Sequence, residues 1–283
     1  MARTELVPLP RRTGRIAYRH RSDGAQWGFE DFALTRDALG GRCLSVHCEM
    51  AFDAEHVVRE TVLNVDPALQ PIDAYVRILN QGVPTGSGWF RFGETEAEGE
   101  SFTKAAGRLS QRTAIERPMR GFGVHALMGD GWLAAAFPFE RGAGHTHFLG
   151  QRNLLHSLHH FGATGPSLEI SASGLTYTGM ETIEVPAGSF TCHRLDFTGM
   201  TNAHPPYTMW ISADGDFLYV QGVVEGYMDS LFQLDQLTGA PLGWARRRAN
   251  SPLAGRSCWL AWSASPAGHR RCRSTRSASC SRR

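Results

Sequence analysis

The sequence predicts an all-β fold with minor α content, namely a large curved antiparallel sheet or incomplete β-barrel that clasps one or two short helices. The first observation behind this prediction is the stretch 168–237, where apolar and polar residues alternate and turn residues separate the alternating segments. The second is the N-terminal part, 15–115, where short strand-like segments follow one another closely, as in an antiparallel meander. The third is the stretch 121–165, where the alternation stops and helical spacing replaces it.

Most of the first 115 residues are predicted strands. The clearest is 44–52, in which apolar residues occupy the even positions and more polar residues the odd ones. Turn signals such as Ser22-Asp23-Gly24 separate one strand from the next. The predicted strands of this part are 15–20, 27–35, 44–52, 57–65, 72–79, 88–92, 100–104 and 108–115.

Two predicted hairpins dominate the second half. In the first, Pro186-Ala187-Gly188-Ser189 separates 182–185 from 190–197, because proline fixes φ and glycine adopts the conformation that a return turn needs. In the second, Ala213-Asp214-Gly215-Asp216 separates 207–212 from 217–224. Within 190–197 the apolar residues change from even positions, Phe190 and Cys192, to odd positions, Leu195 and Phe197. This change predicts a β-bulge near His193-Arg194. The other predicted strands here are 168–177 and 227–237.

Two short helices are expected between the two groups of strands. Val124, Leu127, Met128 and Trp132 recur at helical offsets, and Pro138 ends this run. The second helix is expected at 153–161. On its helical wheel, Leu154, Leu158 and Phe161 share one face, and His156, His159 and His160 lie on the opposite face.

Composition suggests one large domain with different segments at its ends. The 283 residues carry a formal net charge of +2, but the chain from Gln236 onward holds ten arginines and no acid. The preceding residues therefore carry 19 basic and 27 acidic side chains. We expect a flexible N-terminal arm at 1–14, a half-barrel domain at 15–237, and a basic, disordered tail at 238–283, for which a shifted reading frame is an alternative.

Several classes of function are disfavoured. No apolar run has the length of a membrane span, and the N-terminus lacks the apolar core of a secretory signal, so a cytoplasmic location is expected. The six cysteines form no Cys-x-x-Cys pair, which argues against a zinc ribbon or a dithiol redox motif. No Gly-x-Ser-x-Gly elbow, phosphate loop or dinucleotide fingerprint is present. Arginine bias alone does not indicate a specific nucleic-acid partner.

Histidines between Gly144 and Phe161 form the sharpest local signal. His145 and His147 point to the same side if they lie on a strand, and His156 and His160 lie one turn apart if they are helical. Either spacing lets two imidazoles bind one divalent metal such as zinc or iron. The alternative is a solvated polar face with no ligand.

A catalytic role is the second interpretation of this region. His156, His159 and His160 are candidate acid–base groups, and Asp130, which lies close to Trp132, is a candidate pocket carboxylate. The alternative for Asp130 is an ordinary Gly-Asp-Gly turn. On the strand 44–52, His47 and Glu49 share a face. If that face points into a barrel, the two residues are a candidate acid–base pair; the alternative is an exposed outer face.

The two hairpins carry a family resemblance. The first motif is Val185-Pro186-Ala187-Gly188-Ser189-Phe190-Thr191-Cys192, and the second is Trp210-Ile211-Ser212-Ala213-Asp214-Gly215. In this order the two motifs resemble those of an uncharacterised bacterial domain family with a curved antiparallel half-barrel, similar to bacterial lipoprotein carriers. The specific part of the resemblance covers about 60 residues. These are turn and core positions, so the resemblance implies the fold and no catalytic residue.

The predicted function follows from the concave side of such a sheet. A curved sheet forms a mainly apolar cavity, so we expect a hydrophobic or aromatic small molecule to bind there, lined by Trp132, His125, Trp210 and Tyr219. The alternative is a metal-assisted or acid–base enzyme, a lyase, isomerase or hydrolase, that uses the His145–His160 cluster. A scaffold that binds a partner protein on its outer face is a third option. The sequence does not indicate an oligomeric state.

Overall fold

Eight consecutive strands form the first half of the protein. The computed structural model describes residues 8–52, 54–119, 121–149, 153–159, 162–163, 165–200, 204–226 and 228–243. All of these belong to the first of two units of the chain, Met1–Ala245. The strands of the first half are β1 (Arg11–His20), β2 (Gln26–Arg36), β3 (Arg42–Phe52), β4 (Glu55–Val65), β5 (Pro71–Asn80), β6 (Val83–Phe92), β7 (Glu96–Thr103) and β8 (Gly107–Ala114).

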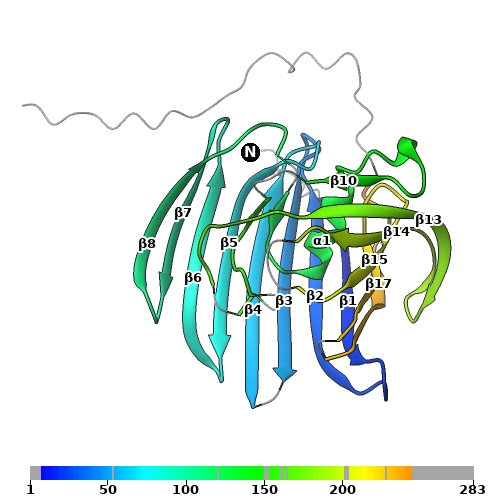
Figure 1. The fold of residues 1–283 in the computed structure, drawn as a ribbon, viewed down its shortest axis with the longest axis horizontal. Coiled ribbons are helices and arrows are strands. Elements are labelled where there is room, and N and C mark those ends of the chain that lie inside the picture. Colours follow the sequence, from blue (N-terminus) through cyan, green and yellow to red (C-terminus); the bar gives the residue numbers. More distant parts are fainter. Residues whose placement is uncertain are drawn as a thin grey trace, which may run out of the picture. The chain divides into compact units, whose positions relative to one another are not determined.

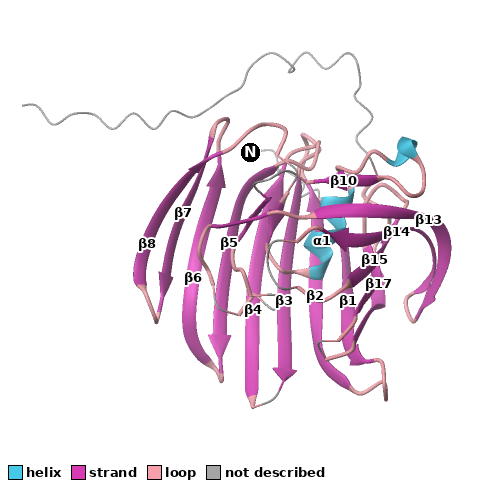
Figure 2. Cartoon of the chain, in the orientation of Figure 1, coloured by secondary structure: helices cyan, strands magenta, loops and turns pink. Residues whose placement is uncertain are grey.

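The second half combines short strands, one α-helix and the two predicted hairpins. The helical elements are α1 (Leu127–Ala134) and the 3₁₀ turn η1 (Phe139–Arg141). The strands are β9 (Phe122–Gly123), β10 (Thr146–Phe148), β11 (Asn153–Leu155), β12 (Glu169–Ser171), β13 (Gly174–Val185), β14 (Gly188–Thr198), β15 (Tyr207–Ser212), β16 (Tyr219–Val224) and β17 (Ser230–Thr238). Figure 2 shows how little of the described chain is helical.

Fourteen strands of the described residues form one sheet in the order β10-β13-β14-β15-β16-β17-β1-β2-β3-β4-β5-β6-β7-β8. Every neighbouring pair is antiparallel, and Figure 1 shows the sheet to be curved. β8 and β10 are its edges, so it does not close into a barrel. A small second sheet has the order β12-β11-β9. The predicted fold class is therefore confirmed.

Pairing of β1 with β17 corrects the expected N-terminal limit of the sheet. Residues 11–14 were expected to belong to a flexible arm, but Arg11 pairs with Thr35 of β2, and Thr13 pairs with Thr238 of β17. The segment shows no apolar alternation because polar side chains occupy both of its faces, while its backbone is held from two sides. The expected basic tail falls almost entirely on residues 244–283, which lie outside the described residues.

The predicted bulge is present, but its extra residue lies on the neighbouring strand. Tyr177 pairs with Leu195 and Gly179 pairs with Arg194, so Thr178 of β13 has no direct counterpart on β14. The extra residue in β13 shifts its register against β14, and this shift accounts for the change of apolar positions along β14.

The helix expected at 153–161 is wrong for the described residues of that segment. Residues 153–155 form β11, which pairs with β12 on one side and with β9 on the other. Leu154 and Leu155 are both buried there, while Leu158, expected on the apolar helix face, is 48% exposed. His160 and Phe161 lie outside the described residues.

Two glycines leave room for close packing around α1. A side-chain carbon at Gly131 would collide with the carbonyl oxygen of Phe217, and one at Gly129 would meet Val124. At the start of the helix, Glu30 of β2 accepts hydrogen bonds from the amides of Leu127 at 2.8 Å and Met128 at 2.9 Å. A carboxylate is favourable at a helix N-terminus, so this contact fixes α1 to the sheet. No helix among the described residues is long and apolar enough to cross a membrane.

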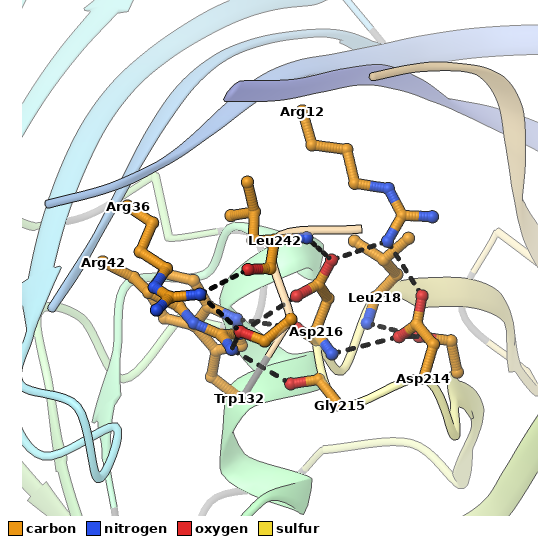
Figure 3. A network of polar contacts seen from close by, with 11 residues as sticks. Arg12, Arg36, Arg42, Trp132, Asp214, Gly215, Asp216, Leu218 and Leu242 are labelled. Carbon is orange, nitrogen blue, oxygen red and sulfur yellow. Dashed lines mark hydrogen bonds and ion pairs between the residues drawn. The ribbon is translucent and has the colours of Figure 1, made fainter. Parts of the chain in front are cut away.

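A buried ionic network fastens the segment that follows β17 (Figure 3). Asp216 is fully buried, accepts hydrogen bonds from Arg12 at 2.7 Å and from the Leu242 amide at 2.9 Å, and lies 3.6 Å from Arg42. Arg36 donates to the Leu242 carbonyl oxygen at 2.6 Å. The network therefore joins β1, the β15–β16 turn and the end of the described chain.

Candidate functional site

A partly open cavity of about 80 Å³ lies between the first four strands, α1 and the last three strands. Both its apolar wall and its polar groups combine residues from the N-terminal strands, the α1 region and the C-terminal strands. The apolar wall is made of Trp27, Met50, Leu127, Val224 and Phe232, with the ring of Tyr18 beside them. The polar groups are Arg59, His125, Asp130, His204, Tyr207 and Ser230.

A larger depression of about 780 Å³ lies elsewhere, across β17 and β1 to β5. Its charged side chains already pair with one another: Arg15 donates to Asp31 at 2.6 Å, and both are more than one-third exposed. His47 lines this depression and lies 2.9 Å from Glu49, and both side chains are partly exposed. The exposure of both side chains confirms the outer-face interpretation of that pair, and the partly open cavity beside α1 is the better candidate site.

Asp130 and two tyrosines form the polar end of the cavity. Tyr207 donates to Asp130 Oδ2 at 3.2 Å, and its hydroxyl oxygen lies 3.0 Å from that of Tyr219. Both tyrosines are buried, while Asp130 keeps part of its surface accessible. Burial raises the pKa of Asp130 to about 7, against the opposing hydrogen bond from Tyr207. The carboxyl group can therefore gain or lose a proton near neutral pH.

A second polar group lies around Glu30 and Arg59. Glu30 accepts a hydrogen bond from Tyr18 at 3.0 Å, and the Tyr18 hydroxyl is 3.5 Å from Cys48 Sγ. Arg59 donates to Cys48 Sγ at 3.7 Å and to the carbonyl oxygen of His125. Burial raises the pKa of Glu30, while the two α1 amides and the Arg59 charge oppose this change. Burial also raises the pKa of the Cys48 thiol to about 11, so Cys48 is a packed thiol and not a nucleophile.

Two buried histidines, His125 in the cavity wall and His156 packed against it, are neutral groups. His125 Nε2 lies 2.7 Å from the Ser157 carbonyl oxygen, and His156 Nε2 lies 3.1 Å from that of Val124. Because a carbonyl oxygen only accepts, each Nε2 carries a proton. Burial lowers the pKa of His125 to about 3 and that of His156 well below its usual range. The rings meet edge to face at 5.0 Å.

The four residues expected to line the cavity divide into two pairs. His125 lines it, and Tyr219 reaches it through Tyr207. Trp132 and Trp210 do not: the Trp132 indole donates to the Asp216 carbonyl oxygen at 3.2 Å, and the Trp210 indole donates to Glu181 at 2.5 Å. Trp132 is two residues from Asp130 on α1, so the two side chains point in different directions.

The expected histidine cluster is not assembled around one point. His145 and His147 pack their rings against Phe137, whereas His156 packs against His125. The His156–His160 pairing assumed a helix, which the described residues do not form, and His160 itself lies outside them. His159 is partly exposed, and its amide is bonded to the Ser157 hydroxyl. Within the described ranges, no three His, Cys, Asp or Glu side chains are arranged to hold a metal ion.

Sequence reasoning missed Arg59, Tyr207 and Glu30. Arg59 lies between Val57 and Thr61 on the buried face of β4, and Glu30 lies on the buried face of β2. A charged residue at an inward position of a strand is a signal that the sequence offered. Tyr207 gave no such signal, because a tyrosine at the start of a strand is common in any sheet.

The comparisons with known proteins bear on the fold alone. No protein-family model matches the chain, and the curated proteins contain no match. A solved β-barrel-like protein of the domain of unknown function DUF1849 from Brucella abortus is similar in structure, with a TM-score of 0.51 at 8% identity, over 82% of this chain and 98% of that one. A protein of YmcC-like fold from Bacteroides fragilis matches 82% of this chain and 96% of its own, with 8% identity and a TM-score of 0.28, which is too low to support an argument. The predicted resemblance to an uncharacterised curved-sheet family is therefore confirmed at the level of the fold.

Proposed function

We propose that the protein binds a small hydrophobic or aromatic compound in the cavity beside α1. The observation that carries this proposal is the combination of an apolar wall of Trp27, Met50 and Phe232 with hydrogen-bonding groups at one end. Apolar walls supply affinity through the area that they remove from water, and a few polar groups fix the orientation of the ligand.

The volume of the cavity limits the size of the ligand that it can enclose. Its volume of about 80 Å³ is well below the ~300 Å³ at which cavities for drug-sized ligands begin, and below the ~150 Å³ of an apolar cavity that binds benzene. The cavity therefore encloses only part of one small ring or the end of a longer molecule, and the remainder extends through the open side.

Toluene titrated into the full-length protein is expected to bind saturably, as followed by chemical-shift changes in NMR spectra. Replacing Val224 by phenylalanine places a ring in the cavity and should weaken toluene binding about tenfold or more. The matched control is Val83→Phe, since Val83 is 50% exposed on β6 and does not line the cavity. Equal binding by the two variants would show that toluene binds elsewhere and would contradict the proposal.

Acid–base catalysis in the same cavity is the second candidate function. The observation that favours it is Asp130, a cavity carboxyl group with its pKa raised to about 7 and a tyrosine hydroxyl within hydrogen-bonding distance. This version uses Asp130 in place of the His145–His160 cluster.

Exchange of the α-hydrogens of cyclohexanone with D₂O, followed by NMR, tests this second candidate. The wild-type protein is expected to accelerate exchange above the buffer rate, and Asp130→Asn to reduce the accelerated part about 100-fold. Exchange at the buffer rate in the presence of wild-type protein would leave binding as the function of the cavity.

A further inference from the structure

At the polar end of the cavity, three oxygen groups form a hydrogen-bonded chain that runs from Asp130 through Tyr207 to Tyr219. We propose that Asp130, Tyr207 and Tyr219 form a relay that recognises a phenolic or enolic hydroxyl group on the bound compound. This inference rests on the proposed function, because it names the chemical class of the ligand for the same cavity.

The Tyr207 hydroxyl group has a single proton and two possible acceptors. Tyr207 lies within hydrogen-bonding distance of both Asp130 at 3.2 Å and Tyr219 at 3.0 Å, but it can donate to only one of them at a time. When Asp130 is ionised, Tyr207 donates to it and accepts from Tyr219. When Asp130 is protonated, Tyr207 accepts from the carboxyl group and donates to Tyr219. The relay can therefore reverse its direction while all three groups stay bonded.

The backbone makes room for these groups at two glycines. A side-chain carbon at Gly222 would overlap the Tyr219 hydroxyl, so only glycine leaves room for it on the central strand β16. Gly131 lets α1 lie against the Phe217 carbonyl oxygen, which brings the neighbouring Asp130 to the tyrosines. Glycine in a strand or helix weakens that element, so two such positions around one relay indicate a site.

The carboxyl group of Asp130 has an oxygen that can accept a further hydrogen bond. Among the described residues its carboxyl group makes one hydrogen bond, through Oδ2, and it lines the cavity with part of its surface accessible. Oδ1 is therefore available to a hydroxyl group on a ligand. A ligand without a polar atom would leave this oxygen without a hydrogen bond. Sites that bond a hydroxyl group therefore discriminate strongly against ligands that lack one.

The charges that face Asp130 leave it able to act in either protonation state. Glu30 of β2 disfavours its ionised form, whereas Arg59 of β4 and the Tyr207 hydroxyl of β15 favour it. The other titratable groups at the cavity are Tyr18 of β1, His125 and His204, and burial lowers the pKa of both histidines, so they are neutral at pH 7. Arg59 already donates to Cys48 Sγ and to the His125 carbonyl oxygen, and Asp130 can take up a proton, so a neutral hydroxyl compound suits the cavity better than a charged one.

Phenol and toluene differ by one hydroxyl group in place of a methyl group, so their binding to the full-length protein tests the inference by calorimetry or NMR. The wild-type protein is expected to bind phenol about tenfold more tightly than toluene. Tyr207→Phe and Tyr219→Phe should each bring the two affinities within about threefold. Tyr75→Phe is the matched control and should retain the preference, because Tyr75 is 41% exposed and lies outside this cavity.

The outcomes separate the inference from the function on which it rests. Toluene and phenol binding equally to the wild-type protein would overturn the relay and leave the hydrophobic cavity standing. A preference for phenol that survives both Tyr207→Phe and Tyr219→Phe would also overturn the relay. Failure of both compounds to bind would contradict the proposed function and the inference together.

Discussion

Replacing Asp216 by asparagine is expected to lower the free energy of unfolding by about 3–5 kcal/mol. Asp216 is fully buried and lies next to two arginines, Arg12 at 2.7 Å and Arg42 at 3.6 Å, whose side chains are each less than one-tenth exposed. Asparagine keeps the shape of the side chain but removes its charge. The two guanidinium groups then remain buried with less compensation, which costs far more than the loss of an exposed ion pair.

Urea unfolding at pH 7, followed by fluorescence of the tryptophans, measures this change. Asp31→Asn is the matched control, because Asp31 also pairs with an arginine, Arg15, but both side chains are more than one-third exposed. Its expected effect is below about 1 kcal/mol. If the two variants lost equal stability, the buried ionic network in Figure 3 would stabilise the fold no more than an exposed ion pair does.

The strands and hairpins were predictable because their signals are local. Alternation in 44–52 and the turn residues at Pro186–Ser189 depend on a few consecutive residues, and β3 and the β13–β14 hairpin lie where expected. Segment 153–161 was not predictable in this way. Its spacing of Leu154 and Leu158 fits a helix, but β11 is stabilised by pairing with β9 and β12, which come from elsewhere in the sequence.

The cavity was only partly predictable for a related reason. Asp130 and His125 lie in the stretch where the sequence predicted a helix against the sheet, and the structure places both at the cavity. Tyr207 and Arg59 reach the same point from β15 and β4, and no local pattern relates strands so far apart in the sequence. The prediction of a histidine cluster assumed that neighbours in sequence are neighbours in space. In the structure, His145 and His147 both pack against Phe137, away from His156.

Buried neutral histidines also predict how stability depends on pH. The pKa of His125 is lowered to about 3, and an unfolded histidine titrates near ~6.5. Between these values the unfolded chain binds a proton that the folded protein does not. The stability that His125 contributes is therefore fully present above pH ~6.5, and it is lost as the pH falls, by up to about 1.4 kcal/mol per pH unit.

Asp130 and Glu30 act in the opposite direction in the same range. Their pKa values are raised by burial, so the folded protein holds protons that the unfolded chain has released, and acidification favours folding at these two groups. The pH dependence of wild-type stability alone would therefore not isolate the histidine. The difference between the wild-type protein and a variant at each pH does so, because the contributions of the two acids are common to both proteins.

His125→Asn is the suitable variant, because His125 has a φ of 55° and asparagine tolerates this left-handed conformation better than most residues. We expect the stability of the wild-type protein relative to His125→Asn to be constant above pH ~7 and to fall by about 2–3 kcal/mol between pH ~6.5 and ~4.5, as measured by urea unfolding at each pH. His56→Asn is the control, since His56 lies on the outer face with its side chain 47% exposed and should show no such fall. A difference between the wild-type protein and His125→Asn that does not change with pH would mean that His125 is hydrated in the folded protein, and the wall behind the cavity would then be open to water.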